Sequence, residues 1–241
     1  FILPRPADDK KVSADGDVTF ASSIKNFLKT FATFFTKKAA VISILFMLLY
    51  RLPEALLAKV CPLFLLDKTS AGGMGLTTAQ LGFVQGTVGV IGLTIGGILG
   101  GVAAARGGLK KWLWPMVAAI SIPDSVYIYM SYAENVSFPV INALIFLEQF
   151  GYGFGFTAYM LFLIYYSRGE SKTAHYAICT AFMALSMMIP GLFAGYLQMQ
   201  LGYKMFFVVA MLLCLVTVAV SAFIKVDSEF GKKDSDESKN D

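Results

Sequence analysis

The chain has 241 residues, of which 56% are hydrophobic and 15% charged, with a net charge of +4 and a mean hydropathy of +0.65. This balance excludes an ordinary water-soluble domain and indicates a polytopic membrane protein. The basic residues are spread over loops rather than clustered among aromatics, which argues against nucleic acid as a partner.

The first part of the chain is polar and then becomes amphipathic. Residues 1–17 read as a polar linker. Over residues 18–37, apolar side chains recur at near-helical spacing with lysines between them, for example Phe20, Ile24, Phe27 and Phe31 around Lys25. The pattern predicts a cytoplasmic interfacial helix lying on the membrane. A helix docked on the rest of the protein is the alternative.

Six long apolar segments follow, and each exceeds the ~20 residues that span the hydrocarbon core. They cover residues 39–66, 79–105, 112–132, 137–166, 174–199 and 203–224. The expected fold is therefore an all-α membrane protein with a six-helix transmembrane bundle over residues 38–225. Residues 226–241 are charged, lack aliphatic side chains beyond Val226 and are expected to form a disordered cytoplasmic tail.

Loop charge predicts the orientation, because lysine and arginine collect on the cytoplasmic side. One set of flanks carries most of the basic residues, namely Lys37, Lys38, Arg106, Lys110, Lys111, Arg168, Lys172, Lys225, Lys232 and Lys233. The other set holds only Lys68 and Lys204. Both termini are therefore expected in the cytoplasm.

Several ionisable residues fall inside these apolar segments, where each charge costs about 2.5–3.5 kcal/mol on insertion scales. Counting the helical rise from the membrane ends places Arg51 at ~18 Å, Glu54 at ~22 Å, Asp124 at ~18 Å and Glu148 at ~15 Å. All four reach the middle of the bilayer. We expect them to bind a solute and couple its movement to protons.

Arg51 and Glu54 are three residues apart and should neutralise each other in part. The alternative to transport is a static ion-pair lattice of Arg51 with Glu54 and Glu148, with Asp124 facing a neighbouring backbone. Three acids against one base favour groups that take up and release protons. The polar and aromatic neighbours expected to line a cavity are Tyr50, Gln149, Tyr152 and Tyr159.

Two further patterns concern packing and the membrane surface. In the second segment, Gly92, Gly96 and Gly100 form a stripe that lets two helices approach closely. Tyr127, Tyr129 and Tyr132 end the third segment and are typical of an interfacial aromatic belt.

Metal and enzyme chemistry find little support. The three cysteines lie far apart in apolar segments and the chain has one histidine, so neither a structural zinc site nor a cofactor is expected. No H-E-x-x-H or G-x-S-x-G motif occurs, so the sequence does not predict an enzyme.

The loop "GGVAAARGGLKK" resembles the G-x-x-x-D-R-x-G-[RK]-[RK] signature of the major facilitator superfamily through Gly101, Arg106, Gly108 and Lys110. It departs from the signature at Ala105 and Leu109. The resemblance implies that this loop takes part in gating.

The stretches "LLYRLPEALLAKVCPLFLLD", "LEQFGYGFGFTAYM" and "KTAHYAICTAFMAL" are similar to AmpG-type permeases, the peptide–acetyl-CoA transporter family. Their shared features are a base and an acid three residues apart, an acid before a glycine-rich run, and a T-A-x-Y-A opening. The resemblance implies the C-terminal half of a twelve-helix protein whose partner is a missing N-terminal six-helix half. Arg51, Glu54 and Glu148 would then line the central cavity, while Asp124 has no counterpart.

These features predict a proton-coupled symporter in a bacterial inner membrane that imports a polar or anionic solute such as muropeptide or peptidoglycan fragments. Its partners would be the small-molecule solute, protons, membrane lipid and the missing half. Two alternatives remain: a non-transporting receptor or scaffold of transporter ancestry, and a major facilitator transporter for another solute.

Overall fold

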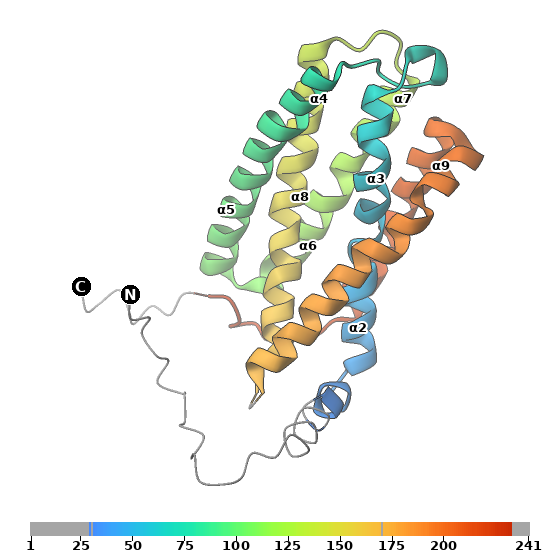
Figure 1. The fold of residues 1–241 in the computed structure, drawn as a ribbon. Coiled ribbons are helices and arrows are strands. Elements are labelled where there is room, and N and C mark those ends of the chain that lie inside the picture. The colour runs from blue at the N-terminus through green and yellow to red at the C-terminus, as the bar shows by residue number, and fades with distance from the viewer. Residues whose placement is uncertain (1–28, 30, 170, 233–241) are drawn as a thin grey trace, which may run out of the picture.

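The computed structural model describes residues 29, 31–169 and 171–232, and within these residues it contains helices and no β-strand. The elements, shown in Figure 1, are α2 (Ala40–Leu49), α3 (Leu52–Leu66), η1 (Thr69–Ala71), α4 (Thr78–Phe83), η2 (Val84–Gly89), α5 (Val90–Gly107), α6 (Leu109–Ser121), η3 (Ile122–Asp124), α7 (Ser125–Tyr132), α8 (Phe138–Ser167) and α9 (Lys172–Phe223). The prediction of an all-α protein is confirmed for this part of the chain.

Among the described residues, three helical stretches are long and apolar enough to cross a membrane: Ala40–Leu66, Thr78–Gly107 and Lys172–Phe223. The outer surface of the bundle carries many exposed apolar side chains, and Leu192 and Met199 are each 77% exposed. Apolar surface on this scale is suited to lipid rather than to water. The chain is therefore an integral membrane protein.

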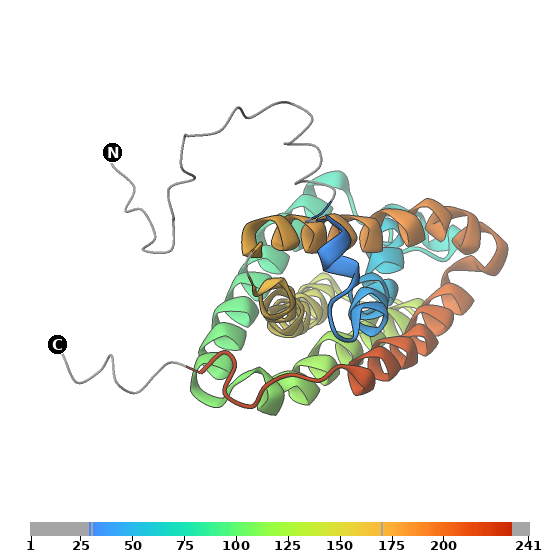
Figure 2. The same cartoon turned by 90° about the horizontal axis from the view of Figure 1, so that it is seen from below.

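Helix α8 lies in the middle of the bundle, next to α5 and α6, while the two limbs of α9 flank α2 and α3 (Figure 2). Glycines bring α5 against α8. A Cβ added at Gly92 would lie 2.7 Å from the carbonyl oxygen of Phe146, and one at Gly100 would lie 2.9 Å from that of Phe154. The small-residue stripe thus permits backbone contact, as its spacing predicts.

Helix α9 combines the fifth and sixth predicted segments. Gly202 has φ of 67° and ψ of 170°, so the chain bends there and continues as a second limb. This left-handed φ is readily adopted only by glycine.

Three helical paths are interrupted inside the bundle. Between α2 and α3, Arg51 leaves helical geometry at φ −105° and ψ 18°, and Pro53 cannot donate the next backbone hydrogen bond. A π-helix, η2, separates α4 from α5. The 3₁₀ turn η3, which contains Pro123, separates α6 from α7. Such irregular backbone inside a membrane protein is tolerated where it is buried in protein or lines a cavity.

The structure describes part of the expected interfacial helix and part of the expected C-terminal tail. The linker 1–17 and residues 18–28 of the expected interfacial helix lie outside the described residues. Phe34 is fully buried against the rings of Tyr166 and Phe182, so this part docks on the bundle. The expected disordered tail requires correction at residues 226–232, because Phe230 is buried and its carbonyl accepts a hydrogen bond from Leu109 N at 2.8 Å.

Candidate functional site

Three acids from three separate elements meet inside the bundle. Glu54 lies in the first turn of α3, Asp124 in η3 and Glu148 on α8, and one carboxylate oxygen from each lies within 4.8 Å of the other two. They are 7%, 5% and 2% exposed. Carboxylates so close together in a buried site cannot all be charged, so they must share protons or a cation.

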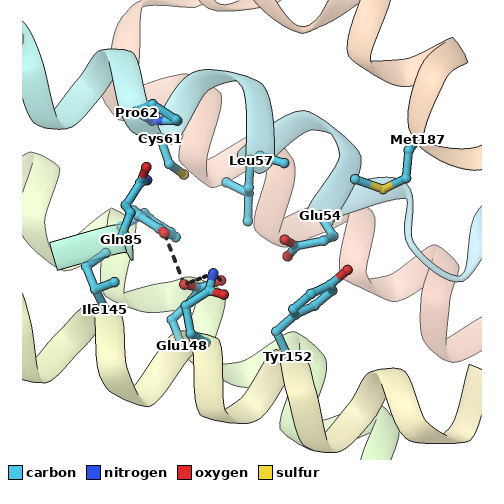
Figure 3. A pocket seen from close by; sticks show the side chains of 12 residues that line it. Glu54, Leu57, Cys61, Pro62, Gln85, Ile145, Glu148, Tyr152 and Met187 are labelled. Carbon is cyan, nitrogen blue, oxygen red and sulfur yellow. Dashed lines mark hydrogen bonds between the residues drawn. The ribbon is translucent and has the colours of Figure 1, made fainter. Parts of the chain in front are cut away.

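A cavity of about 310 Å³, here called the acid cavity, opens between α3 and α8. Figure 3 shows Glu54 entering it from α3, with Glu148 and Tyr152 opposite on α8. Tyr127 donates a hydrogen bond to Glu148 Oε2 at 3.2 Å, and Gln149 Nε2 donates to the same oxygen at 3.0 Å. Its wall also includes Leu57, Ala58, Cys61, Pro62, Gln85, Ile145 and Met187. In the part of the chain that the structure describes, no lysine or arginine lines this cavity.

The structure does not form the expected ion pair between Arg51 and Glu54. Within the described residues, the one ion pair closer than 4.0 Å joins Lys232 to Glu229 at the surface. Arg51 instead donates a hydrogen bond to the hydroxyl of Tyr152, and its Cζ lies 4.5 Å from the centroid of the Phe156 ring. The cause is the helix break at Arg51, which removes the regular geometry that the i, i+3 spacing assumes.

Arg51 instead lines a second cavity, of about 530 Å³, here called the arginine cavity. Leu93, Gly97, Gly153, Phe156, Thr157, Met160 and Leu161 complete its wall. Tyr152 lines both cavities and stands between the acids and the base. Arg51 Nε is buried without a hydrogen-bond partner, so the guanidinium retains an unused donor.

The other proposed lining residues divide into three groups. Gln149 and Tyr152 line the acid cavity. Tyr50 instead lines a much smaller cavity of about 10 Å³ beside Glu54 and Asp124. Tyr159 is fully buried between α2 and α8, where its hydroxyl donates to Met47 O at 2.7 Å and its ring centroid lies 5.8 Å from Arg51 Cζ.

Sequence reasoning missed several polar wall residues. Tyr127 was assigned to the interfacial belt with Tyr129 and Tyr132, but it is buried and bonded to Glu148, whereas the other two are exposed. Its spacing of three residues from Asp124 was the available signal, since that places both on neighbouring helical positions. Gln85, an amide inside a glycine-rich apolar segment, was the second such signal.

The expected gating loop connects α5 to α6. Arg106 and Lys110 are exposed there, and neither forms an ion pair within the described residues. Gly108 has φ of 76° and ends α5, while Gly101 faces open space. An added Cβ at Gly108 would lie 2.9 Å from Ser228 O, so the C-terminal segment packs directly on this loop.

The predicted resemblance to AmpG-type permeases is confirmed by curated relatives. The chain is 23% identical to AmpG 4 of Rickettsia conorii over 207 residues, which cover 86% of this chain and 48% of the relative. It is 24% identical to AmpG 2 of Rickettsia prowazekii over 210 residues, covering 87% and 48%. With AmpG 1 of Rickettsia bellii it shares 23% over 219 residues, covering 90% and 50%.

All three relatives are named as assumed transporters. The chain spans about half the length of the curated relatives it matches. No protein-family model matches the chain.

Proposed function

We propose that the chain is the C-terminal six-helix half of an AmpG-type secondary transporter of the major facilitator superfamily, and that protons drive its uptake of a polar solute. The observation that carries this proposal is the meeting of Glu54, Asp124 and Glu148 beside a cavity that can hold a polar ligand, with no ion pair to a base within 4.0 Å among the described residues. A static lattice would pair these acids with Arg51, which instead lies on aromatic rings.

In this mechanism the acids exchange protons and the rings and amides hold the solute. Glu54 and Glu148 are the proton carriers. Asp124 adds a third nearby carboxylate, whose charge favours protonation of the other two. Tyr127 and Gln149 hold Glu148 in place through their hydrogen bonds. Protonation reduces the charge of the acid cavity, which lowers the cost of closing it away from water.

The charge of Arg51 favours the proposal that the solute is anionic, such as a muropeptide or a peptidoglycan fragment. A sugar or peptide body fits against Tyr152 and Phe156, and a carboxylate of the solute can pair with the guanidinium. The names of the relatives agree with transport, and the substrate class follows from the family resemblance together with Arg51.

The proposed whole protein has twelve helices and lies in a bacterial inner membrane with both termini of this half in the cytoplasm. Its N-terminal six helices close the other side of the two cavities. Alternating access then comes from rocking one half against the other around the midplane site. Gly108 and Arg106 belong to the loop that packs differently in the two states.

The test is uptake of labelled muropeptide by proteoliposomes that contain the whole protein, with and without an imposed inward proton gradient. We expect accumulation above the outside concentration only with the gradient. Binding of the solute without accumulation would identify a receptor and contradict the proposal. Accumulation that is indifferent to the gradient would contradict proton coupling.

A further inference from the structure

A small cavity lies beside the acid cavity, on the other side of Glu54. It measures about 10 Å³, and its wall comprises Tyr50, Pro53, Glu54, Ile120, Ser121, Asp124 and Thr217. This volume is close to the minimum that holds one water molecule. The cavity therefore has room for one particle of about that size and no second one.

Oxygen atoms without hydrogen-bond partners face this space. Ser121 is 7% exposed, and within the described residues its Oγ, which lies near the Cys214 thiol, has no hydrogen bond of ordinary geometry. Glu54 Oε2 is also buried without one. A polar atom left unpaired in an apolar interior destabilises the folded state, so a bound ligand that satisfies both oxygens is favoured.

Two further oxygens complete the donor set. Asp124 Oδ2 accepts a long hydrogen bond from Cys214 Sγ at 3.6 Å. Thr217 Oγ1 donates its proton to Tyr50 O at 3.0 Å, which leaves the lone pairs of the hydroxyl available. Among the described residues, no basic side chain lines the cavity, so none of these wall residues neutralises the two acids.

We propose that this cavity binds a dehydrated monovalent metal cation, Na⁺ being the best fit, between Glu54, Ser121, Asp124 and Thr217. Ca²⁺, whose radius is close to that of Na⁺, has oxygen ligands at about 2.3–2.6 Å, so two ligands of one ion of this size are at most about 5 Å apart. The 4.8 Å limit on the separations of the acid oxygens meets that requirement. Mg²⁺ fits poorly because it keeps several of its waters, for which this cavity has no room.

The position of Glu54 connects the cation to the solute. Its side chain lines both the acid cavity and the small cavity, so it faces the solute on one side and the cation on the other. The small cavity thus adjoins the solute cavity through one shared carboxylate.

The test is Na⁺ binding to the detergent-purified whole protein, without solute or gradient. Thermal unfolding is followed at fixed pH and ionic strength while NaCl replaces choline chloride. We expect a saturable rise in the unfolding temperature. Ser121→Ala should weaken the apparent Na⁺ affinity several-fold, and Asp124→Asn should abolish the response.

Ser131→Ala is the matched control. Ser131 is also buried, but its hydroxyl donates to Ile128 O at 2.9 Å outside the cavity, so this variant should respond to Na⁺ like the unaltered protein. Absence of any Na⁺-specific rise, or an equal rise in Ser121→Ala, would overturn the proposal. A larger rise with CaCl₂ than with NaCl would overturn the monovalent assignment. If Asp124→Asn does not fold, Ser121→Ala decides the matter.

The binding assay requires no transport, so its result stands apart from the proposed function. A protein that accumulates muropeptide but shows no Na⁺ response leaves the transporter proposal intact and removes the cation site. A Na⁺ response in a protein that transports nothing supports the cation site and contradicts the transporter proposal.

Discussion

Arg51 lies over the ring of Phe156, with its Cζ 4.5 Å from the ring centroid, although Glu54 follows it by only three residues. Tyr152 and Tyr159 approach the same guanidinium at 5.5 and 5.8 Å. The base is thus stabilised by aromatic faces and a hydroxyl rather than by a carboxylate. This arrangement leaves its charge available to an anionic solute.

The first prediction concerns the planar shape of the Arg51 guanidinium. Arg51→Lys keeps the charge but loses the planar group that stacks on Phe156 and bonds a carboxylate at two points. We expect KM for muropeptide uptake to rise about tenfold or more, corresponding to roughly 1–2 kcal/mol, with the maximal rate changed much less. The measurement is uptake rate against muropeptide concentration.

Arg168→Lys provides the control. Arg168 also lies on an aromatic ring, 4.3 Å from the centroid of Phe230, but it is remote from both cavities. That variant should keep the original KM. An unchanged KM in Arg51→Lys would remove Arg51 from solute binding.

The second prediction concerns Glu148. Glu148→Gln keeps the size of the side chain and removes the exchangeable proton, so gradient-driven uptake should be abolished while the protein remains folded. Glu134→Gln, a change at an exposed loop acid, should leave uptake unaltered. Full uptake by a folded Glu148→Gln protein would exclude this residue from the mechanism.

The third prediction tests the contact between α5 and α8. Gly92→Ala should lower the free energy of unfolding by about 1–3 kcal/mol, because the new methyl group would overlap the backbone at Phe146. At Gly195, in α9, an added Cβ meets nothing within 4 Å. Gly195→Ala should therefore be neutral or stabilising by about 0.5–1 kcal/mol. Thermal unfolding in detergent compares the two, and equal stability would show that the close contact is dispensable.

The fourth prediction concerns the C-terminal segment. Phe230 packs on the Tyr165 ring with centroids 5.0 Å apart. Phe230→Ala should release the segment and make tryptic cleavage after Lys225 several-fold faster. Phe223→Ala, which alters an exposed side chain at the end of α9, should leave the rate unchanged. Equal cleavage rates in the two variants would show that Phe230 does not hold the segment.

Depth along a helix could be predicted from the sequence, whereas rotation about its axis could not. The helical rise placed Glu54, Asp124 and Glu148 at one level because it depends only on residue count. Asp124, which matches nothing in the family pattern, was found by this count alone. The direction of the Arg51 side chain depends on the helix break next to Pro53 and on aromatic rings of α8. These rings lie about a hundred residues further along the chain.

Tyr127 illustrates the same limit. Three tyrosines at the end of one segment indicate an interfacial aromatic belt. Packing against α8 nevertheless directs Tyr127 inward to Glu148. The small cavity could not be predicted for a related reason, since its wall combines residues from α3, α6, η3 and α9. All-α structure, by contrast, follows from apolar runs longer than the membrane is thick.

The most direct measurement is solute-induced proton movement in proteoliposomes that contain the whole protein and a pH-sensitive dye, in Na⁺-free buffer without an imposed gradient. Addition of muropeptide outside should acidify the lumen, and Glu148→Gln should abolish that change. Muropeptide entry without any lumenal acidification would contradict the claim that the buried acids couple protons to transport.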